Sequence, residues 1–233
     1  MKFSIDPRII QMFPNVKIGV LIAHNMENSN EQQNVYNLLR RAEKDAREKY
    51  QLEGLITLPK IADWREAYRK FGFKPSSFRS SIEALMRRIL QGKSLPSINS
   101  IVDIYNVISI EYTLPVGGDD IDQIDGGIIL TIADGTERFI MLGSDKFEEI
   151  KKSEVIYRDD KEVLCRAWNY RECNKSKITT NTKNVCLVVE GLEHSSEEEI
   201  LKGLSRLREL LTPLCKGTFQ EFLLNKNNLE VFF

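Results

Sequence analysis

The chain has 233 residues, of which 42% are hydrophobic and 29% are charged, and its formal net charge at pH 7 is −1. A chain of this length and composition can bury a full core, which excludes a disordered protein. Its apolar runs are far shorter than the roughly 20 residues that cross a bilayer, and it begins with a short polar segment instead of a signal pattern. We therefore expect a cytoplasmic protein without a membrane partner.

The first half of the chain has mainly helical periodicity after one early strand. Ser80 and Glu83 form a capping-box pattern, which begins one of the helices, and Gly72 and Gly92 end two of them. Apolar positions at helical spacing support the other helices, whereas the early strand alternates and ends in apolar residues. We expect this strand at residues 16–24 and helices at residues 29–50, 63–71, 80–90 and 98–111.

The second half consists mainly of short β-type runs separated by Gly, Asp, Lys or Asn. Turns are expected at Pro115 to Gly118 and at Gly126–Gly127. A helix is expected from Ser196 to Leu211, with Pro213 ending it. We expect strands at residues 128–133, 138–142, 154–157, 163–166, 184–190, 217–224 and 229–233. Helices followed by strands in this order predict an α+β fold.

Several common sites are excluded by residue types and spacing. His24 and His194 lie far apart in the chain and outside known histidine motifs, so we expect no histidine-based triad. The four cysteines match no zinc or redox spacing, and the glycine segments lack the lysine of a phosphate-binding loop, so we expect no metal and no cofactor. The acidic run before Gly126 lacks the terminal glutamate of a calcium loop. It predicts a solvated turn at Asp119, Asp120, Asp122 and Asp125.

Positive charge is concentrated between Lys60 and Lys93, where nine Lys or Arg residues accompany only three acids. Such segregation in a nearly neutral chain indicates a polyanion partner. Candidate RNA-binding residues are Arg79, Arg87 and Arg88. The alternative is that these arginines form an ordinary solvated helix face.

Two polar residues interrupt the apolar pattern of the helix expected at residues 98–111. Asp103 and Asn106 are three positions apart, so they lie on one flank of that helix. One interpretation is that both belong to a site. The other is that they cap or bridge the neighbouring loop.

An ordered set of short motifs resembles the stand-alone B3/B4 domain family, which is related to the editing module of the phenylalanyl-tRNA synthetase beta subunit. The resemblance covers roughly residues 64–211. Its motifs are Trp64 to Arg69, Phe78 to Leu85 with Arg87–Arg88, Leu95–Pro96, Val102–Asp103, Asn106, Leu114 to Gly117, Asp120, Gly135 with Glu137, Glu154 to Tyr157, Cys165–Arg166, Trp168 to Arg171, Thr179 with Thr182, and Glu190.

The resemblance implies a fold and a function. The fold is a B3/B4-like α+β domain with a mixed, mainly antiparallel sheet and packed helices at residues 61–233, against which an α/β region at residues 1–60 packs. The activity is trans-acting editing, in which the ester of a mischarged tRNA is hydrolysed by a positioned water; the partners are this tRNA and its amino-acid moiety. The alternative is a non-catalytic module that keeps an RNA- or amino-acid-binding surface.

The resemblance also implies site residues. Asn106 matches the family's asparagine, and with the backbone of Gly117 and Gly118 it is expected to hold the water or the oxyanion. Gly117 stands where the family has a histidine, and Trp168 to Tyr170 replace a glycine-rich turn. Residues expected to bind the substrate are Asp103, Trp168, Asn169, Arg171 and Glu190. Glu190 matches the family's pocket glutamate; the alternatives are that it pairs structurally with Arg166 or Arg171 and that Trp168 is a core aromatic.

Overall fold

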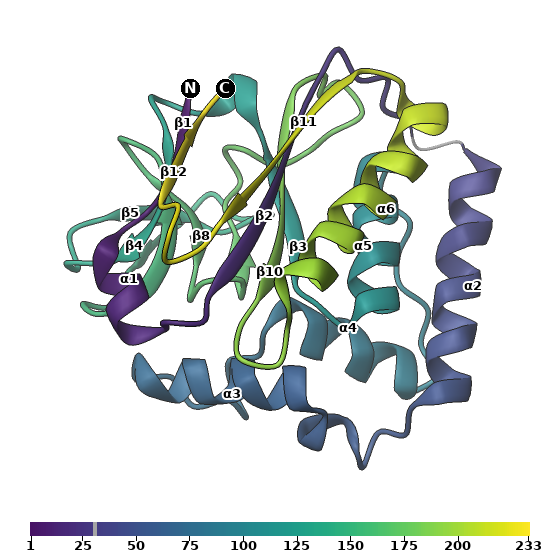
Figure 1. Cartoon of the computed structure of the whole chain (residues 1–233), viewed down its shortest axis with the longest axis horizontal. Helices are drawn as coiled ribbons and strands as arrows, with labels where there is room; N and C mark the ends of the chain where they lie inside the picture. Colours follow the sequence, from purple (N-terminus) through teal and green to yellow (C-terminus); the bar gives the residue numbers. More distant parts are fainter. Residues whose placement is uncertain (30–31) are drawn as a thin grey trace.

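The computed structural model describes residues 1–29 and 32–233 and shows strands gathered on one side and in the middle, with helices on the other side and below (Figure 1). The strands are β1 (Lys2–Ile5), β2 (Lys17–His24), β3 (Val116–Asp120), β4 (Ile128–Ile132), β5 (Arg138–Ile140), β6 (Phe147–Glu149), β7 (Val155–Arg158), β8 (Val163–Arg166), β9 (Arg171–Glu172), β10 (Val185–Gly191), β11 (Thr218–Leu224) and β12 (Glu230–Phe232). The helices are α1 (Pro7–Met12), α2 (Gln33–Lys49), α3 (Pro59–Lys70), α4 (Ser81–Leu90), α5 (Ser100–Tyr112) and α6 (Glu197–Cys215), with short 3-10 helices η1 (Leu55–Thr57) and η2 (Ile121–Gln123).

The strands form a six-stranded sheet in the order β12-β1-β4-β7-β8-β9, a four-stranded sheet in the order β11-β2-β10-β3, and a separate β5-β6 hairpin. Every pairing between these strands is antiparallel except that of β1 with β4. The expected α+β fold with a mixed, mainly antiparallel sheet is therefore confirmed. Because β3 ends the four-stranded sheet, one of its edges carries no neighbouring strand from the described residues.

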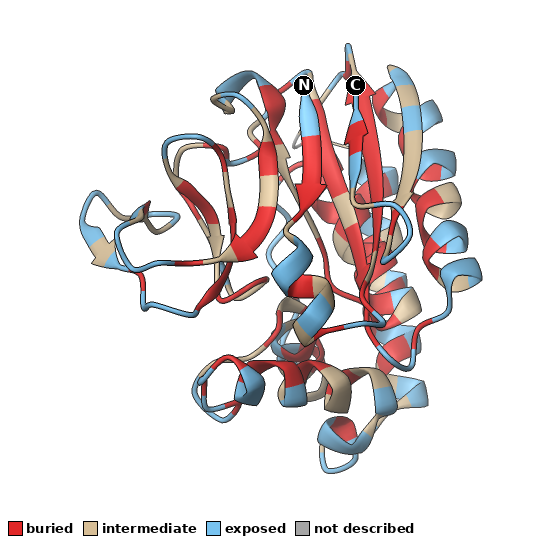
Figure 2. Cartoon of the chain, turned by 60° about the vertical axis from the view of Figure 1, so that its left-hand side comes forward, coloured by how far each residue is buried: buried red, intermediate tan, exposed pale blue. Residues whose placement is uncertain are grey.

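Helices cover the four-stranded sheet on one face. In Figure 1, α6 lies against this sheet, α5 follows beside it and α2 lies outermost, while α3 crosses below the strands. Figure 2 shows that the strands are largely buried, whereas exposed residues are concentrated on the outward faces of the helices and in the loops. Glycine at position 19 permits close packing of α6 on β2, because a Cβ there would lie 2.7 Å from the Ile200 Cγ2 atom.

The first 60 residues supply an inner strand to each of the two larger sheets. Strand β1 lies between β12 and β4, and β2 lies between β11 and β10. The N-terminal strand also pairs with the last strand of the chain, so the two termini lie side by side (Figure 1). The boundary expected at residue 60 stays a prediction, but the strand pairing joins the residues on its two sides.

The structure corrects three expectations about local structure. The segment predicted as a turn from Pro115 to Gly118 belongs largely to β3, whose pairing with β10 overrides the turn preference of its glycines. Pro213 lies inside α6, which continues to Cys215, although a proline was expected to end it. The predicted solvated turn is also wrong for Asp120, which is 7% exposed and accepts a hydrogen bond of 2.6 Å from the Thr182 hydroxyl.

Most of the other expected elements agree with the structure. Ser80 caps α4 by accepting a hydrogen bond from the Glu83 backbone N–H, and the four cysteines are free, three of them buried. Residues 30 and 31 of the helix predicted at 29–50 lie outside the described residues; the described helix begins at Gln33. Within the described part of the chain, no helix is long and apolar enough to cross a membrane.

Candidate functional site

A cavity of about 440 Å³ lies against strands β3 and β10 of the four-stranded sheet. Its walls come from β3, β7, β8, β9 and β10, from the turn between β8 and β9, from the two residues after β5 and from the first residue of α4. The lining residues are Ser81, Val116, Gly117, Gly118, Asp119, Met141, Leu142, Tyr157, Cys165, Trp168, Asn169, Tyr170, Arg171, Glu172, Val188 and Glu190. A cavity of this size with both aromatic and charged walls is typical of a small-molecule site.

A buried glutamate organises one wall of this cavity. Glu190 is 2% exposed, and its Oε1 atom accepts hydrogen bonds from the Tyr157 hydroxyl at 2.6 Å and the Trp168 indole N–H at 2.7 Å. Its Oε2 atom accepts a third bond, of 2.9 Å, from the Asn169 side-chain amide. Burial raises the pKa of Glu190, while the three donors oppose that rise. The structural alternative of an ion pair with Arg166 or Arg171 is wrong.

The turn that carries Trp168 and Asn169 is held in an unusual backbone conformation. Ala167 and Trp168 have φ angles of 45° and 66°, a region that non-glycine residues seldom adopt. The buried Glu154 carboxylate accepts the Ala167 backbone N–H at 2.7 Å, and Trp168 donates its own N–H to the Val155 carbonyl at 2.6 Å. These bonds fix the direction of the Trp168 and Asn169 side chains toward Glu190.

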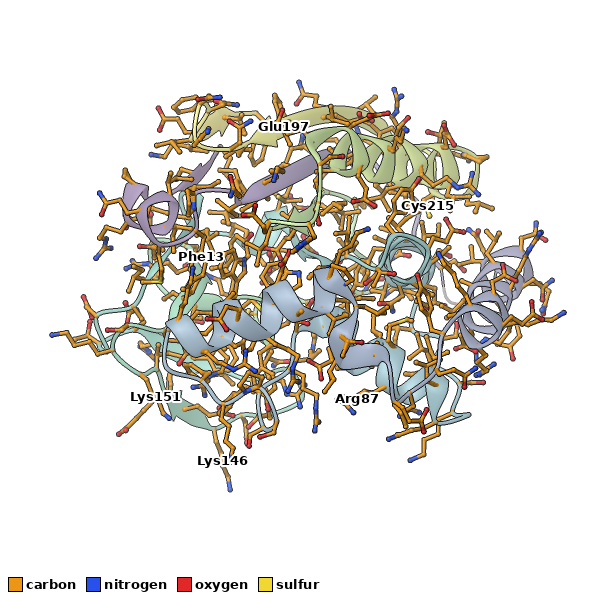
Figure 3. The ribbon with its side chains drawn as sticks, turned by 60° about the horizontal axis from the view of Figure 1, so that its bottom comes forward. Phe13, Arg87, Lys146, Lys151, Glu197 and Cys215 are labelled. Atoms are coloured by element: carbon orange, nitrogen blue, oxygen red, sulfur yellow. The ribbon has the colours of Figure 1, made fainter. Side chains whose placement is uncertain are left out.

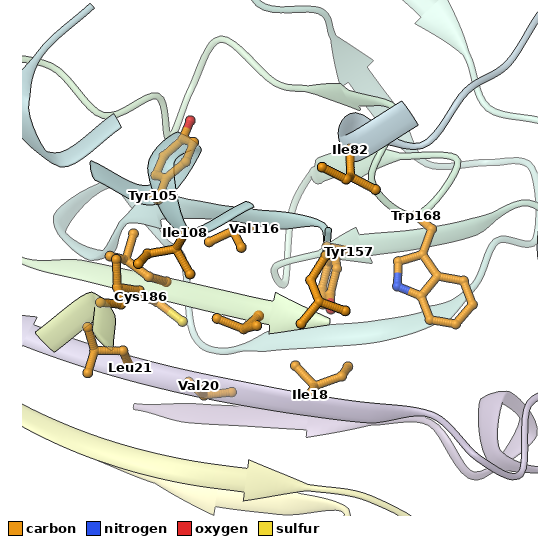
Figure 4. Packing of buried hydrophobic residues seen from close by; sticks show 14 of the residues in the cluster. Ile18, Val20, Leu21, Ile82, Tyr105, Ile108, Val116, Tyr157, Trp168 and Cys186 are labelled. Atoms are coloured by element: carbon orange, nitrogen blue, oxygen red, sulfur yellow. The ribbon is translucent and has the colours of Figure 1, made fainter. Parts of the chain in front are cut away.

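Trp168 also contacts the hydrophobic core. Its ring lies 5.0 Å from that of Trp64 and 4.9 Å from that of Phe13, both in edge-to-face geometry. Figure 4 shows Trp168 and Tyr157 on the side of the core where Ile18 of β2 packs. Trp168 therefore belongs both to the core and to the cavity wall, so the two interpretations of this residue are compatible.

Two further carboxylates line the cavity near its glycine wall. Glu172 has a pKa raised to about 7, first by burial and then by repulsion from Asp119. The pKa of Asp119 is raised to about 6, first by burial and then by the charges of Asp159 and Asp120, although a hydrogen bond of 2.5 Å from the Ser176 hydroxyl opposes this rise. Both groups therefore change charge close to neutral pH.

The two glycines of β3 serve different purposes. A Cβ at Gly118 would lie 2.4 Å from the Cys186 carbonyl oxygen, so the close approach of β10 requires glycine there. At Gly117 a Cβ would meet only the Glu172 Oε1 atom, at 3.3 Å. The cavity therefore reaches the main chain at Gly117, and the Glu172 carboxylate lies above it.

Strand register sets the direction of the Gly118 N–H group. Glu190 donates its backbone N–H to the Pro115 carbonyl, and hydrogen-bonded and non-hydrogen-bonded pairs alternate along an antiparallel ladder. Gly117 opposite Val188 is then a hydrogen-bonded pair, and Gly118 opposite Leu187 is not. The Gly118 N–H therefore points away from β10, off the open edge of the sheet.

The structure brings together six of the eight residues predicted for catalysis and substrate binding. The cavity wall includes Gly117, Gly118, Trp168, Asn169, Arg171 and Glu190. Asp103 and Asn106 are not part of this wall. Asp103 is 2% exposed and accepts bonds from the Ser97 hydroxyl and from the Ile98 N–H, so it bridges the loop before α5. The half-buried Asn106 lies on the same helix, and its catalytic role stays a prediction.

The predicted RNA-binding arginines surround a buried carboxylate. Glu83, which is fully buried, accepts bonds from Arg65 at 2.8 Å and from Arg87 at 3.0 Å, and Arg79 lies 4.0 Å from the same oxygen atom. Arg88 instead donates to the Ser94 carbonyl at 2.9 Å. Figure 3 shows the underside of the molecule, where α3 crosses in front and Arg87 is labelled. Part of the charge excess of this segment is therefore neutralised inside the fold.

Sequence reasoning missed Glu172, Asp119 and Ser81 as members of the site. Asp119 was placed in a solvated turn, and Glu172 follows immediately after a predicted binding residue, Arg171. The Ser81 hydroxyl oxygen is buried without a hydrogen-bond partner among the described residues. The acidic run before Gly126 was the available signal for Asp119; a single glutamate between Arg171 and Cys173 offered no such signal.

Comparison with known proteins identifies the family. The family model described as the B3/4 domain matches residues 63–211, which is well over half of the chain. The chain belongs to the B3/4 domain family. The resemblance expected from the motifs between residues 64 and 211 is thereby confirmed.

Relatives of this B3/4 domain carry one common name. The chain is 31% identical over 143 residues to a phenylalanine–tRNA ligase beta subunit of Fusobacterium nucleatum, covering 59% of this chain and 17% of that protein. It is 37% identical over 81 residues to the beta subunit of Chromobacterium violaceum, covering 35% of this chain and 10% of that protein. The chain therefore spans less than a fifth of the length of these curated relatives.

A solved structure is similar to nearly the whole chain. It is an N-terminal fragment of the phenylalanyl-tRNA synthetase beta subunit from Pyrococcus horikoshii, with a TM-score of 0.49 and 14% sequence identity. The match covers 95% of this chain and 53% of that fragment.

Proposed function

We propose that this B3/4 domain is a trans-acting deacylase that hydrolyses the ester bond of mischarged aminoacyl-tRNA. The observation that carries the proposal is the cavity itself, which is lined by the two glycines of β3 together with aromatic and carboxylate side chains. We propose tRNA as the carrier of the ester because the relatives are named as tRNA ligase subunits.

The glycine strand offers what ester hydrolysis requires. The carbonyl oxygen of an ester becomes negatively charged when water attacks, and a fixed backbone N–H stabilises that charge without rearrangement. The Gly118 N–H is such a donor, since it points off the sheet edge at a position that lines the cavity. The missing side chain at Gly117 lets the ester approach the main chain.

The remaining side chains of the cavity wall support selection of the amino-acid side chain. Tyr157, Trp168 and Val188 provide apolar surface, and the Glu190 Oε2 atom accepts only one bond from the described residues, that of Asn169. A carboxylate oxygen has capacity for about two donors, so a substrate hydroxyl can donate to this atom. Glu190 would then favour substrates that carry a hydroxyl group over those that lack it.

Contact with the tRNA is proposed for Arg171 and for arginines at and before helix α4. Arg171 is exposed and stacks on Tyr170 at 4.4 Å, and Arg79 precedes the cap of α4, whose first residue lines the cavity. Arg87 is engaged with Glu83, which leaves Arg88 as the more available partner for a phosphate. These cations offer partners for the phosphate backbone of the tRNA.

The proposal is tested by incubating purified protein with tRNAs that carry correct and incorrect amino acids, and measuring release of the labelled amino acid. Faster release from at least one mischarged tRNA than from its correctly charged form supports the function. Binding of charged tRNA without release would identify the alternative, a non-catalytic RNA- or amino-acid-binding module.

A further inference from the structure

One end of the cavity holds two carboxylates that lack a cationic partner. Among residues 1–29 and 32–233, the Glu172 carboxylate makes no hydrogen bond or ion pair, and Asp119 uses one of its oxygens to accept the Ser176 hydroxyl. Glu172 Oε1 lies 3.3 Å from the position that a Gly117 Cβ would take. Side chains two positions apart on a strand share a face, so Asp119 lies on the side of β3 that Glu172 covers.

Buried polar groups normally have hydrogen-bond partners. Among the described residues, the Glu172 carboxylate has none and Asp119 has one, so both carboxylates keep free acceptor atoms at positions that line the cavity.

A ligand with a compact cation would satisfy both carboxylates. An ammonium group has three donors and no acceptor, which matches two carboxylates with free acceptor atoms. A resident metal fits less well, because the described residues contain no cluster of three or more His, Cys, Asp or Glu side chains of the kind that holds an ion.

The remaining cavity wall determines which ammonium compound fits. Apolar side chains such as Trp168 and Val188 lie beyond the acidic end, and Gly117 and Gly118 lie beside it. An aminoacyl ester has an ammonium group, a neutral carbonyl and a side chain attached to one carbon atom. A free amino acid instead adds a carboxylate next to its ammonium group, and that charge is repelled by the two carboxylates that line the cavity.

We propose that Glu172 and Asp119 bind the free ammonium group of an aminoacyl ester. The cavity thereby accepts aminoacyl groups with an unblocked amine and rejects N-acylated aminoacyl groups and free amino acids. The inference rests on the proposed function for the identity of the ester. It adds the chemical class of the substrate and assigns roles to two residues outside those predicted from the sequence.

Binding measurements test this assignment without requiring hydrolysis. The probes are 3′-amino-3′-deoxyadenosine amides of the twenty L-amino acids, their N-acetyl forms and the free amino acids, titrated by calorimetry. We expect at least one amide to bind at least tenfold more tightly than its N-acetyl form and than the free amino acid. Glu172→Gln and Asp119→Asn should each weaken that amide at least tenfold, whereas Glu53→Gln, at an exposed position outside the cavity wall, should not change its affinity.

Several results would overturn the inference. They are equal affinity for the amide and its N-acetyl form, unchanged affinity in a folded Glu172→Gln variant, and absence of binding by every amide. Equal hydrolysis of N-acetylated and free aminoacyl-tRNA would overturn it while leaving the deacylase function in place. Conversely, amine-dependent binding without any deacylation would support the ammonium site and contradict the hydrolytic function.

Discussion

Glu190 is both a candidate specificity residue and a structural centre of the cavity. Its carboxylate receives one donor from each of Tyr157, Trp168 and Asn169, and Asn169 is held in turn by the Tyr68 hydroxyl at 3.1 Å. Removing such an acceptor leaves several donors buried without partners. Any test of Glu190 in substrate selection must therefore separate recognition from loss of folding.

Replacement of Glu190 by alanine should destabilise the protein by about 2–5 kcal/mol, because three buried donors lose their acceptor. Urea unfolding followed by circular dichroism measures this loss. The exposed Glu53→Ala variant is the control and should change the free energy of unfolding by less than about 0.5 kcal/mol. A Glu190→Ala variant as stable as wild type would show that these bonds do not hold the wall together.

Glu172 should make stability depend on pH. Its pKa is raised from an ordinary value of 4.5 to about 7, so the folded state binds a proton more tightly than the unfolded state does. The stability associated with the protonated form is therefore present at low pH and is lost as pH rises from about 4.5 to about 7. In the Glu172→Gln variant, this pH-dependent loss of unfolding free energy, on the order of 1–3 kcal/mol, should be absent.

The measurement is the free energy of unfolding of wild type and Glu172→Gln at several pH values between 4 and 8. The two curves should approach each other at the acidic end and separate toward pH 8, where the variant is more stable. Parallel curves would mean that the Glu172 carboxylate is well solvated or paired in solution.

At the scale of elements, the free edge of β3 connects the sheet to the cavity. The strand pairs with β10 on one side, and its residues 116–119 line the cavity. Its two glycines offer a matched comparison, since an added methyl group meets the backbone of β10 at Gly118 but only the end of the Glu172 side chain at Gly117.

Gly118→Ala should lower the free energy of unfolding by about 1–3 kcal/mol or more, as expected for overpacking against a fixed backbone. Gly117→Ala should change it far less, because the Glu172 side chain can move by a few tenths of an ångström. Thermal unfolding of both variants measures the difference. Equal melting temperatures would contradict the register of β3 against β10.

Two arginines of helix α4 differ in how firmly the fold holds them, and so in how available they are to a phosphate. Arg87 is 27% exposed and bonded to the buried Glu83, whereas among the described residues Arg88 donates only to the Ser94 carbonyl. Arg88→Ala should weaken tRNA binding without lowering stability, and it should reduce the slope of log affinity against log salt by about one if it neutralises one phosphate. Lys44→Ala, at an exposed position of helix α2, is the control. An unchanged slope for Arg88→Ala would remove this residue from the RNA contact.

At the scale of the whole molecule, much of the fold was predictable because its signals are local. Ser80 and Glu83 define the start of α4, and the alternating apolar run before His24 defines β2. The β3 strand was not predictable in the same way, since Pro115 and two glycines favour a turn and only pairing with β10 makes the segment a strand. Pro213 was similarly misleading, because tertiary packing continues α6 past it.

The site was predictable only in part, and for a physical reason. The resemblance correctly assigned Gly117, Trp168 and Glu190 to one site, because these positions belong to the family's ordered motifs. Glu172 and Asp119 come from segments more than fifty residues apart, and their proximity depends on how β9 lies over β3. Position in the fold, not local sequence, makes these two carboxylates part of one cavity.

The central claim is that this cavity hydrolyses aminoacyl esters, and filling it tests that claim most directly. Gly117→Val places a branched side chain in the cavity at a strand position where such residues are well tolerated, and Thr218→Val introduces the same residue on the exposed edge strand β11 as a control. Single-turnover deacylation of the best mischarged tRNA should fall by at least tenfold in folded Gly117→Val and stay unchanged in Thr218→Val. Deacylation at the wild-type rate by folded Gly117→Val, or no deacylation of any mischarged tRNA by wild type, would contradict the account.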